Sequence, residues 1–380
     1  MAKLKRRSVT VRDLCDVMEL IAPCRAAASW DNVGLLAGDP VRKLDRVMLT
    51  IDFTPDVLEE ARRARVSAVV SYHPPLFRPV KRLVADPTTQ EGVVAEAMAS
   101  GISIYSPHTA LDSAVGGTND VLAAIAGLKD VRPFEAVAGG PVECKFVVFV
   151  PPGDVDRVAD AVFDAGAGRI GAYEKCSYRL RGEGTFFGTE ATDPVVGRRG
   201  RLERVDEIRL EVIVPKNRIN DVAAAVRRAH SYEEPAFDVY PLERLPSDKA
   251  GQGRVGGFGR PVSLGALARA LKVKTRASNT VTIGKPGMKL RRGFVCVGAA
   301  GSLPFESAGE PCGQGDVVVT GEIRHHDALR YRRCGVSAVA LGHWASERPV
   351  LGPLAKRLGA LLRGVAVSVS RADRDPFGSV

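Results

Sequence analysis

Apolar, β-branched runs alternate with amphipathic segments from residue 47 onward. The run VMLTID precedes TPDVLEEARRA, where Thr54 is in the position of a helix N-cap and Pro55 is at the first helical position. The alternation continues through VSAVVS, EGVVAEAMAS, ISIYS and TNDVLAAIAG, and it stops near AVAGGP. Strands that alternate with helices indicate βαβ units and a largely parallel sheet. We therefore predict an α/β domain whose first part ends near residue 140.

The next stretch contains an internal repeat. FVVFVPPGDVDRVADAVFDAGA (146–167) matches LEVIVPKNRINDVAAAVRRAHS (210–231), and each copy has the pattern of a strand, a turn at Val-Pro and an amphipathic helix. A further β-rich run follows each copy, and this order is typical of a ferredoxin-like α+β domain. We predict that residues 141–251 form this domain, inserted into a discontinuous α/β domain made of residues 1–140 and 252–380.

From residue 252 the alternation of strands and helices resumes. A second repeat has one copy in each half of the α/β domain. RRARVSAVVSYH (62–73) resembles RRCGVSAVALGH (332–343), and both segments end on a histidine after a predicted strand. Ancient duplication and similar composition of two strands both explain this likeness. In either case the pattern places His73 and His343 at the ends of two strands.

Composition narrows the class of protein. A chain of 380 residues favours two domains over one. No apolar run approaches the roughly 20 residues that cross a bilayer, and the basic N-terminal segment has no apolar stretch behind it, so we expect a cytoplasmic protein without a membrane partner. The seven cysteines are scattered without a C-x-x-C pair, which argues against a disulfide framework and against a thiolate zinc site.

The formal net charge of +10 is compatible with an anionic partner. The densest basic run is VGRRGRLER (196–204), but aromatic residues are only 6% of the chain and none interleaves with that run. A base-stacking platform needs such aromatics. A solvated, arginine-rich surface is therefore favoured over a nucleic-acid site.

Five of the six histidines follow predicted strands, and they are His73, His108, His325, His326 and His343. In open α/β sheets, residues beyond the carboxyl ends of the strands converge at one edge. Two carboxylates accompany them, because Asp112 lies four residues after His108 and Glu347 four residues after His343. Imidazole and carboxylate ligands without thiolate suit zinc, manganese, iron, cobalt or nickel. The pattern indicates a metal centre.

Each residue also has a structural explanation on its own. A single histidine at a strand end is more often a hydrogen-bonded structural residue than a ligand. Asp112 lies in a turn-like sequence, and Glu347 could stand in the first turn of a helix because the helix dipole favours a carboxylate there. The metal hypothesis rests on the number of histidines in equivalent positions.

Five ordered motifs, SWDNVGLLAG, SYHPPLF, YSPHTALD, TGEIRHHDAL and LGHWASERP, resemble those of the GTP cyclohydrolase 1 type 2 homologue family, also called the Nif-three-like family. The central block, which includes GAGRIGAY and HSYEEPAFDVYPLE, is similar to the ferredoxin-like (PII/CutA-like) insertion of the family's longer members. The resemblance covers nearly the whole chain.

The resemblance implies up to two divalent metal ions per chain in a toroidal homohexamer. Carried over to this sequence, His73 and Asp112 would hold one ion, His343 the other, and Glu347 would bridge them. The resemblance also places further residues in the same pocket: His108, His325 and His326 as positioning or proton-transfer groups, and Trp30, Asp31 and Asn32 near the cleft. A turn explains Asp31 and Asn32 equally well.

One position departs from the family pattern, in which two adjacent histidines commonly precede the proline. This chain has Tyr72 and then His73. A phenol has an ordinary pKa of about 10 and is a poor ligand in its neutral form. The second ion should therefore bind more weakly, unless His325, His326 or an ionised Tyr72 completes its site.

These expectations favour a metal-dependent hydrolase, similar to a cyclohydrolase, that acts on a nucleotide-like or other small anionic substrate. The alternative is a metal-binding, regulatory hexamer that is not an enzyme and whose insertion senses a small ligand. No G-x-x-x-x-G-K-[ST] motif is present to cradle phosphates. A third reading, nucleic-acid binding through a positive ring, rests on net charge alone.

Overall fold

Local sequence preferences determine where several helices begin. The structure, a computed structural model, describes residues 8–138, 142–307 and 311–378. Helix α2 (Pro55–Arg63) starts after Thr54, whose hydroxyl accepts a hydrogen bond from the Val57 amide at 3.3 Å. Thr89 and Ser263 cap α3 (Gln90–Ala99) and α8 (Leu264–Thr275) in the same way. None of the helices in the described part of the chain is both long and apolar enough to cross a membrane.

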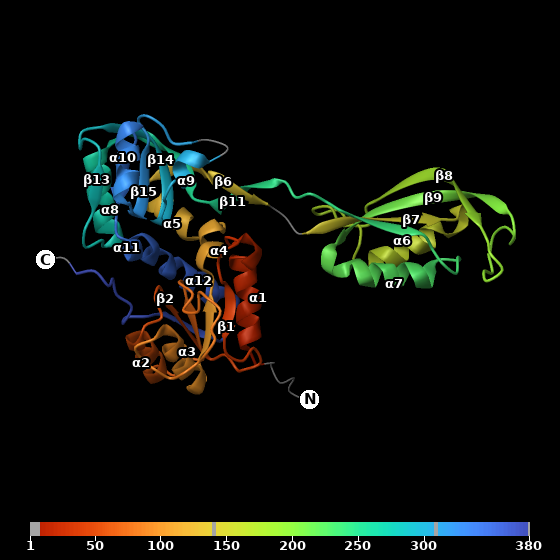
Figure 1. Cartoon of the computed structure of the whole chain (residues 1–380), viewed down its shortest axis with the longest axis horizontal. Helices are drawn as coiled ribbons and strands as arrows, with labels where there is room; N and C mark the ends of the chain where they lie inside the picture. The colour runs from red at the N-terminus through yellow and green to blue at the C-terminus, as the bar shows by residue number, and fades with distance from the viewer. Residues whose placement is uncertain (1–7, 139–141, 308–310, 379–380) are drawn as a thin grey trace. The chain divides into compact units, whose positions relative to one another are not determined.

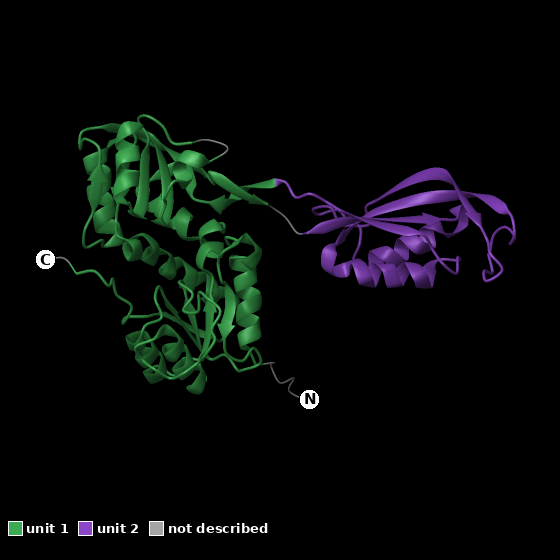
Figure 2. Ribbon diagram, viewed as in Figure 1, with its two compact units in different colours: residues 1–138, 246–380 green, residues 139–245 purple. Residues whose placement is uncertain are grey.

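The chain divides into two units (Figure 2), Met1–Ala138 with Pro246–Val380 and Gly139–Leu245. The expected boundaries were 140/141 and 251/252. The first lies two residues earlier, after Ala138, and the second lies six residues earlier because β11 (Pro246–Gln252) pairs in antiparallel fashion with β6 (Glu135–Ala138). That two-stranded sheet keeps residues 246–251 with the first unit.

Unit 1 contains a five-stranded sheet in the order β1-β4-β3-β2-β17, in which β1 alone is antiparallel to its neighbour. Val47 and Leu49 of β2 pack in a core with α1 and α12, whereas Met48 packs in a second core with α2 and α3. Both faces are covered, as a parallel sheet requires. The elements not yet bounded are β1 (Gly34–Ala37), β2 (Arg46–Thr50), β3 (Ala68–Ser71), β4 (Ser103–Ser106), β17 (Ala366–Val369), α1 (Val11–Ile21) and α12 (Leu351–Leu361).

A six-stranded sheet in the order β13-β16-β15-β14-β12-β5 completes unit 1, with β14, β15 and β16 parallel. Helices α5 and α8 cover the face that carries Val319, and Tyr331 of α10 packs on the face that carries Val318. Trp344 packs against cores of both sheets. The bounds are β5 (Leu128–Arg132), β12 (Arg254–Ser263), β13 (Val281–Ile283), β14 (Lys289–Ala299), β15 (Val317–Glu322), β16 (Ser337–Ala340), α4 (His108–Ser113), α5 (Thr118–Ala126), α9 (Leu303–Glu306), α10 (His325–Arg333) and α11 (His343–Glu347).

The second sequence repeat corresponds to one helix and strand in each sheet. Its first copy contains the end of α2 and β3, and its second copy contains the end of α10 and β16 (Figure 1). The prediction that both strands present a histidine at their ends is confirmed: β3 ends two residues before His73 and β16 three residues before His343. One site can therefore draw a ligand from each sheet.

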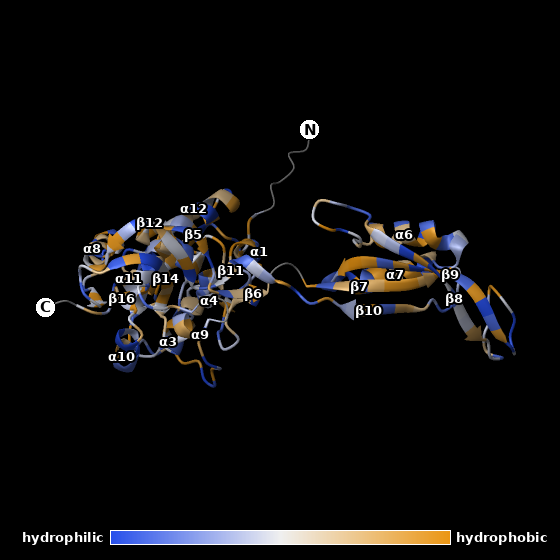
Figure 3. Ribbon diagram, turned by 90° about the horizontal axis from the view of Figure 1, so that it is seen from above, coloured by the Kyte–Doolittle hydropathy of each residue, from blue (hydrophilic) through white to orange (hydrophobic). Residues whose placement is uncertain are grey.

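Unit 2 has the element order that the internal repeat predicts: strand, helix, strand, strand, helix, strand. Its antiparallel sheet has the order β10-β7-β9-β8. Phe146, Val148, Leu210 and Val212 pack against the two helices in its core, and Figure 3 shows β7 as strongly hydrophobic. The bounds are β7 (Glu143–Val150), α6 (Val155–Asp164), β8 (Ser177–Phe187), β9 (Leu202–Pro215), α7 (Ile219–Ala229) and β10 (Phe237–Pro241).

Candidate metal centre

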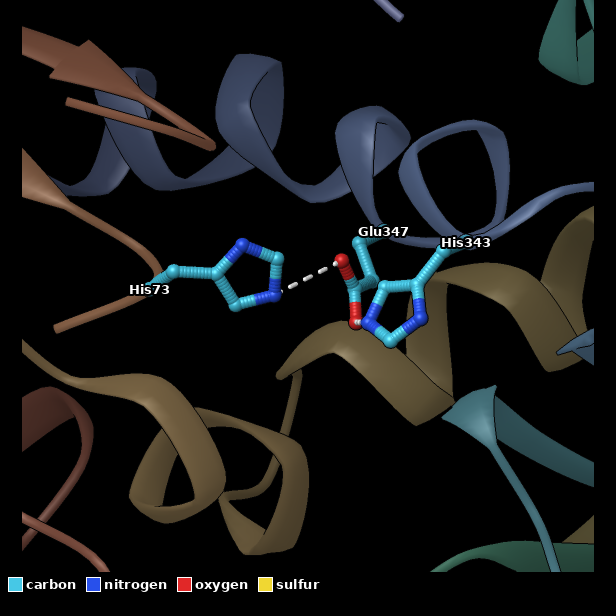
Figure 4. A group of neighbouring side chains, drawn as sticks. All are labelled: His73, His343 and Glu347. Atoms are coloured by element: carbon cyan, nitrogen blue, oxygen red, sulfur yellow. Dashed lines mark ion pairs between the residues drawn. The ribbon is translucent and has the colours of Figure 1, made fainter. Parts of the chain in front are cut away.

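Three side chains from two segments meet in unit 1. One ligand atom from each of His73, His343 and Glu347 lies within 4.8 Å of the others. Figure 4 shows the Glu347 carboxylate between the two imidazoles. Oε2 is 3.2 Å from Nε2 of His73, and Oε1 is 3.2 Å from Nε2 of His343. The four-residue spacing on α11 puts His343 and Glu347 on the same face of the helix.

Two further carboxylates fix the orientation of the imidazoles. Asp52 Oδ1 is 2.8 Å from Nδ1 of His73, and Glu322 Oε1 is 3.1 Å from Nδ1 of His343. A carboxylate that accepts Nδ1–H leaves Nε2 as the atom that binds a metal. Sequence reasoning missed both carboxylates. Asp52 follows β2 and Glu322 ends β15, so the strand-end rule that selected the histidines would have found them.

The electrostatics of the centre depend on Glu347, which is only 3% exposed. Burial raises the pKa of Glu347, but its ion pairs with His343 and His73 outweigh burial and lower that pKa. Burial lowers the pKa of His73, but the contacts with Asp52 and Glu347 outweigh burial and raise that pKa to about 10. The contact with Glu347 raises the pKa of His343 to about 9. The ionised Glu347 carboxylate therefore stabilises positive charge on the two imidazoles beside it.

The donor set fits a divalent ion. Glu347 Oε2 is buried without a well-formed hydrogen bond to any described residue, because the 3.2 Å contact with His73 is an ion pair of poor hydrogen-bond geometry. That oxygen and the two Nε2 atoms are ligand types that zinc and related ions take. His73 and His343 would hold the ion together with Glu347.

A glycine makes room for this arrangement. Gly298 of β14 has φ +62°, and a Cβ at that position would lie 2.8 Å from Glu347 Oε1 and 3.2 Å from His343 Nε2. Gly321 of β15 is similarly restricted, since its Cβ would lie 2.9 Å from the His343 Cα. Only residues without a side chain allow β14 and β15 to approach α11 this closely.

His108 lies beside the cluster, with its ring centroid 5.4 Å from that of His73. Its Nδ1 is 2.7 Å from Oδ1 of buried Asp31, and the amide of Thr109 donates to the other Asp31 oxygen at 3.1 Å. Although burial raises the pKa of Asp31, these bonds lower it overall. His108 has φ +28°, a strained value for a residue with a side chain. The Asp31–His108 pair thus resembles the carboxylate–imidazole pairs of proton-transfer sites.

The WDN motif contributes more than a turn. Asp31 orients His108, and the Asn32 amide donates to the Leu76 carbonyl at 2.5 Å, which ties the motif to the loop after His73. Trp30 is 63% exposed, and its ring centroid lies 6.1 Å from that of His108 and 5.9 Å from that of Phe77. An exposed aromatic pair therefore stands next to the His108 ring.

Asp112 is hydrogen-bonded to Tyr72 and is not part of the group formed by His73, His343 and Glu347. The Tyr72 hydroxyl donates to Asp112 Oδ1 at 2.5 Å. Burial, and then Asp112, raises the pKa of Tyr72 well above its ordinary value, so Tyr72 is a neutral phenol at neutral pH. Burial also raises the pKa of Asp112 to about 6. A role for Asp112 as a ligand remains a prediction.

His325 and His326 are exposed at the first two positions of α10. Their rings contact each other, with centroids 5.6 Å apart, and among the described contacts none joins them to His73, His343 or Glu347. The structure thus brings together three of the seven residues predicted for the site, His73, His343 and Glu347. His108 lies beside them, and Asp112 is hydrogen-bonded to Tyr72. Proton transfer by His325 or His326 remains a prediction.

Comparison with known proteins identifies the family. The model of the Duf34/NIF3 (NGG1p interacting factor 3) family matches residues 9–376. The chain belongs to the Duf34/NIF3 family. It is 38% identical over 365 residues to a Mycobacterium leprae protein named GTP cyclohydrolase 1 type 2 homolog, covering 95% of this chain and 93% of that protein. The resemblance drawn from the five motifs is confirmed.

Solved structures of similar proteins show the same fold. A Bacillus cereus protein related to NIF3 is 30% identical, with a TM-score of 0.75, and the similarity covers 99% of this chain and 100% of that one. A Staphylococcus aureus protein is 24% identical, with a TM-score of 0.78 and the same coverage. The α/β fold class predicted from the sequence is therefore that of the NIF3 family.

Proposed function

We propose that this NIF3-family chain is a divalent-metal-dependent hydrolase for a small anionic or nucleotide-like substrate. The observation that carries the proposal is the buried Glu347 carboxylate between two Nε2 atoms, each oriented by a carboxylate on its far side. Residues that serve only to stabilise a fold do not need a buried charge of this kind, since replacing such a charge with apolar groups is often neutral or stabilising. The name carried by the M. leprae relative supports the same class of reaction.

A bound divalent ion would supply Lewis-acid chemistry, polarising a substrate oxygen and making water more acidic. The chain's own residues would do the rest. His108, with Nδ1–H donated to Asp31, keeps Nε2 available to take a proton from water and return it to the leaving group. The exposed rings of Trp30 and Phe77 offer a surface for a planar part of the substrate.

Positive charge in the loop that follows His73 supports an anionic substrate. The loop after His73 carries Arg78, Lys81 and Arg82, all exposed, within nine residues of that histidine. Asn32 binds the start of this loop through the Leu76 carbonyl, next to the motif that holds His108. Exposed cations of this kind raise the local concentration of anions and weaken with salt.

The first test is metal content by elemental analysis of protein purified without chelator or metal-affinity tag. We expect bound metal in the wild type and its loss in Glu347→Ala and in the isosteric Glu347→Gln, with Glu306→Gln, an exposed glutamate, as the control. A screen of nucleotides and phosphate esters would follow. Hydrolysis should disappear with chelator, return with added metal, and fall in His108→Asn with metal retained. Wild-type protein without metal, or hydrolysis unaffected by its removal, would overturn the proposal.

A second function is favoured by Tyr72. Its neutral hydroxyl donates a hydrogen bond to Asp112 Oδ1, so a second ion would lack the usual second histidine and would share the Asp112 carboxylate with that hydroxyl. A single-ion site fits a metal-binding, regulatory hexamer whose inserted unit senses a ligand. Hydrolysis that is lost with chelator supports the hydrolase whatever the number of ions, whereas a wild type that hydrolyses none of the substrates and binds one ion, rising to two only in Tyr72→His, supports regulation.

A further inference from the structure

The inserted unit contains a pocket of about 720 Å³ that lies wholly within residues 149–236. It is lined by β8, β9, the loop that joins them and the segment after α7. Residues that alternate with the core positions of β7 and β9, such as Phe149, Glu207 and Arg209, form its wall, so it lies on the sheet face opposite α6 and α7. The volume is within the range of small-molecule sites.

Glycines create the space. On this face β8 presents Leu180, Gly182, Gly184 and Phe186, so two apolar side chains flank two positions without any. A Cβ at Gly182 would meet no atom within 4 Å, which means that open space lies over the strand there. Glycine inside a strand commonly marks a close approach by a ligand or another backbone. The floor of the pocket is therefore bare backbone at Gly182, with Leu180 and Phe186 on either side along the strand.

The polar groups of the pocket carry an excess of negative charge. Glu207 lies directly over Gly184, where a Cβ would be 2.3 Å from Oε2, and it forms no ion pair with a described residue. Arg209 is already paired with Glu211 at 2.8 Å and stacks on the Phe149 ring. The partly buried carboxylate of Glu207 is thus the charged group of this pocket that lacks a cationic partner among the described residues.

Two more polar residues, Glu233 and Tyr232, line the pocket. Glu233 accepts a hydrogen bond from the Asp193 amide at 3.1 Å, which ties the β8–β9 loop to the segment after α7. The hydroxyl of Tyr232 is buried without a hydrogen bond to any described residue. Burial, and then Glu207, raises the pKa of Tyr232 to about 12, so the hydroxyl is a neutral group that can donate or accept.

We propose that this pocket binds a small cationic amphiphile, an amine or cationic ring with an aromatic or branched aliphatic body. Glu207 supplies the counter-charge, the Tyr232 hydroxyl takes a hydrogen bond, and Leu180 and Phe186 contact the apolar body. Two observations together select this ligand class: the bare, apolar-walled floor and the carboxylate without a cationic partner. The inference does not rest on the metal centre of the first unit.

Three naphthalenes of nearly equal size test the charge preference on the full chain: 2-naphthylmethylamine, 2-naphthylmethanol and 2-naphthoate. Binding would be measured by calorimetry and by ligand-observed NMR. We expect the amine to bind about tenfold more tightly than the alcohol, and the carboxylate not to bind, because a hydrogen bond to a charged group is worth about that factor. Glu207→Gln should remove the preference for the amine, and Asp206→Asn, the same change at the adjacent exposed position, should not.

A second variant tests the location. Gly182→Val should fill the pocket without backbone strain, because the φ of Gly182 suits any residue and its Cβ meets nothing. It should abolish binding of the amine and of the alcohol while metal content stays unchanged. Equal affinity for the three probes, no binding of any probe to the wild type, or binding that survives Gly182→Val would overturn the proposal.

Discussion

At the scale of single residues, Gly298 stands at a position in the proposed centre that leaves no room for a side chain. Its φ of +62° resembles the +52° of Gly301, but a Cβ at Gly301 would meet nothing within 4 Å, whereas one at Gly298 would press on Glu347 and His343. Alanine at either position should cost about 1 kcal/mol of folding free energy through backbone strain. Only Gly298→Ala should also displace the ligands.

We therefore expect Gly298→Ala to lose most of its bound metal and Gly301→Ala to keep it, at similar stability. Elemental analysis gives the metal content, and urea unfolding gives the stability of each variant. Equal metal content in the two variants would show that the ligands do not need the space at Gly298.

Metal binding should release protons. In the metal-free protein the pKa values of His73 and His343 are about 10 and 9, so both imidazoles are protonated at pH 7.5. An ion binds only the neutral imidazole, so each bound ion should displace about two protons, and the apparent affinity should rise with pH up to these pKa values. Calorimetry in buffers with different ionisation enthalpies measures this release. An apparent binding enthalpy that is the same in every buffer would contradict it.

The sequence predicts histidines at strand ends more readily than it predicts their partners. His73 and His343 were identifiable because each ends a long β-branched run, and Glu347 because it lies one helical turn after His343. His325 and His326 satisfy the same rule but are exposed on α10, since a pattern gives the end of a strand and not the direction of a side chain. The contact between Tyr72 and Asp112 joins positions 40 residues apart, so no local pattern reveals it.

At the scale of secondary-structure elements, buried Arg254 joins β12 to α5. Its guanidinium pairs with Asp120, with 3.1 Å between Nη2 and Oδ2, and donates to the carbonyls of Gly251 and Gly253 at 2.7 Å each. Arg254 is 1% exposed, so loss of Asp120 would leave a buried charge unbalanced.

Asp120→Asn should therefore lower the free energy of unfolding by about 3 kcal/mol, at the low end of the usual range because Asp120 is partly exposed. Urea unfolding measures this change. The double variant Asp120→Leu/Arg254→Met, which removes both charges, should be less destabilised than the single variant. If the double variant has the lower free energy of unfolding, the ion pair itself provides net stability and our account of it is wrong.

Regular elements were predictable and their pairing was not. Periodicity marked β2, α2, β3 and β4 because each has a clear apolar pattern, and Thr54 marked the start of α2 as its capping residue. Strand β6 has only four residues and is mostly exposed, and strand β11 is rich in polar residues, so neither has a clear apolar pattern, and each is stabilised by pairing with the other. For that reason the end of the insertion could not be located from composition alone.

At the scale of the whole molecule, the same pair of strands makes the insertion removable. Ala138 and Pro246 are directly opposite each other in the β6–β11 ladder, so their Cα atoms are about 5 Å apart, and a two-residue turn such as Asn-Gly can join them. Unit 2 has a core of its own, formed by β7, β9 and the two helices. Deletion of residues 139–245 with such a turn should leave unit 1 folded.

We expect the shortened chain to bind the same amount of metal per chain as the full chain, because His73, His343, Glu347 and the carboxylates that orient them all belong to unit 1. It should also lose binding of the cationic naphthalene, because that pocket lies within residues 149–236. Elemental analysis and calorimetry on the two chains separate these functions. A shortened chain that folds, by circular dichroism and cooperative unfolding, but no longer holds metal would mean that the inserted unit contributes to the metal centre.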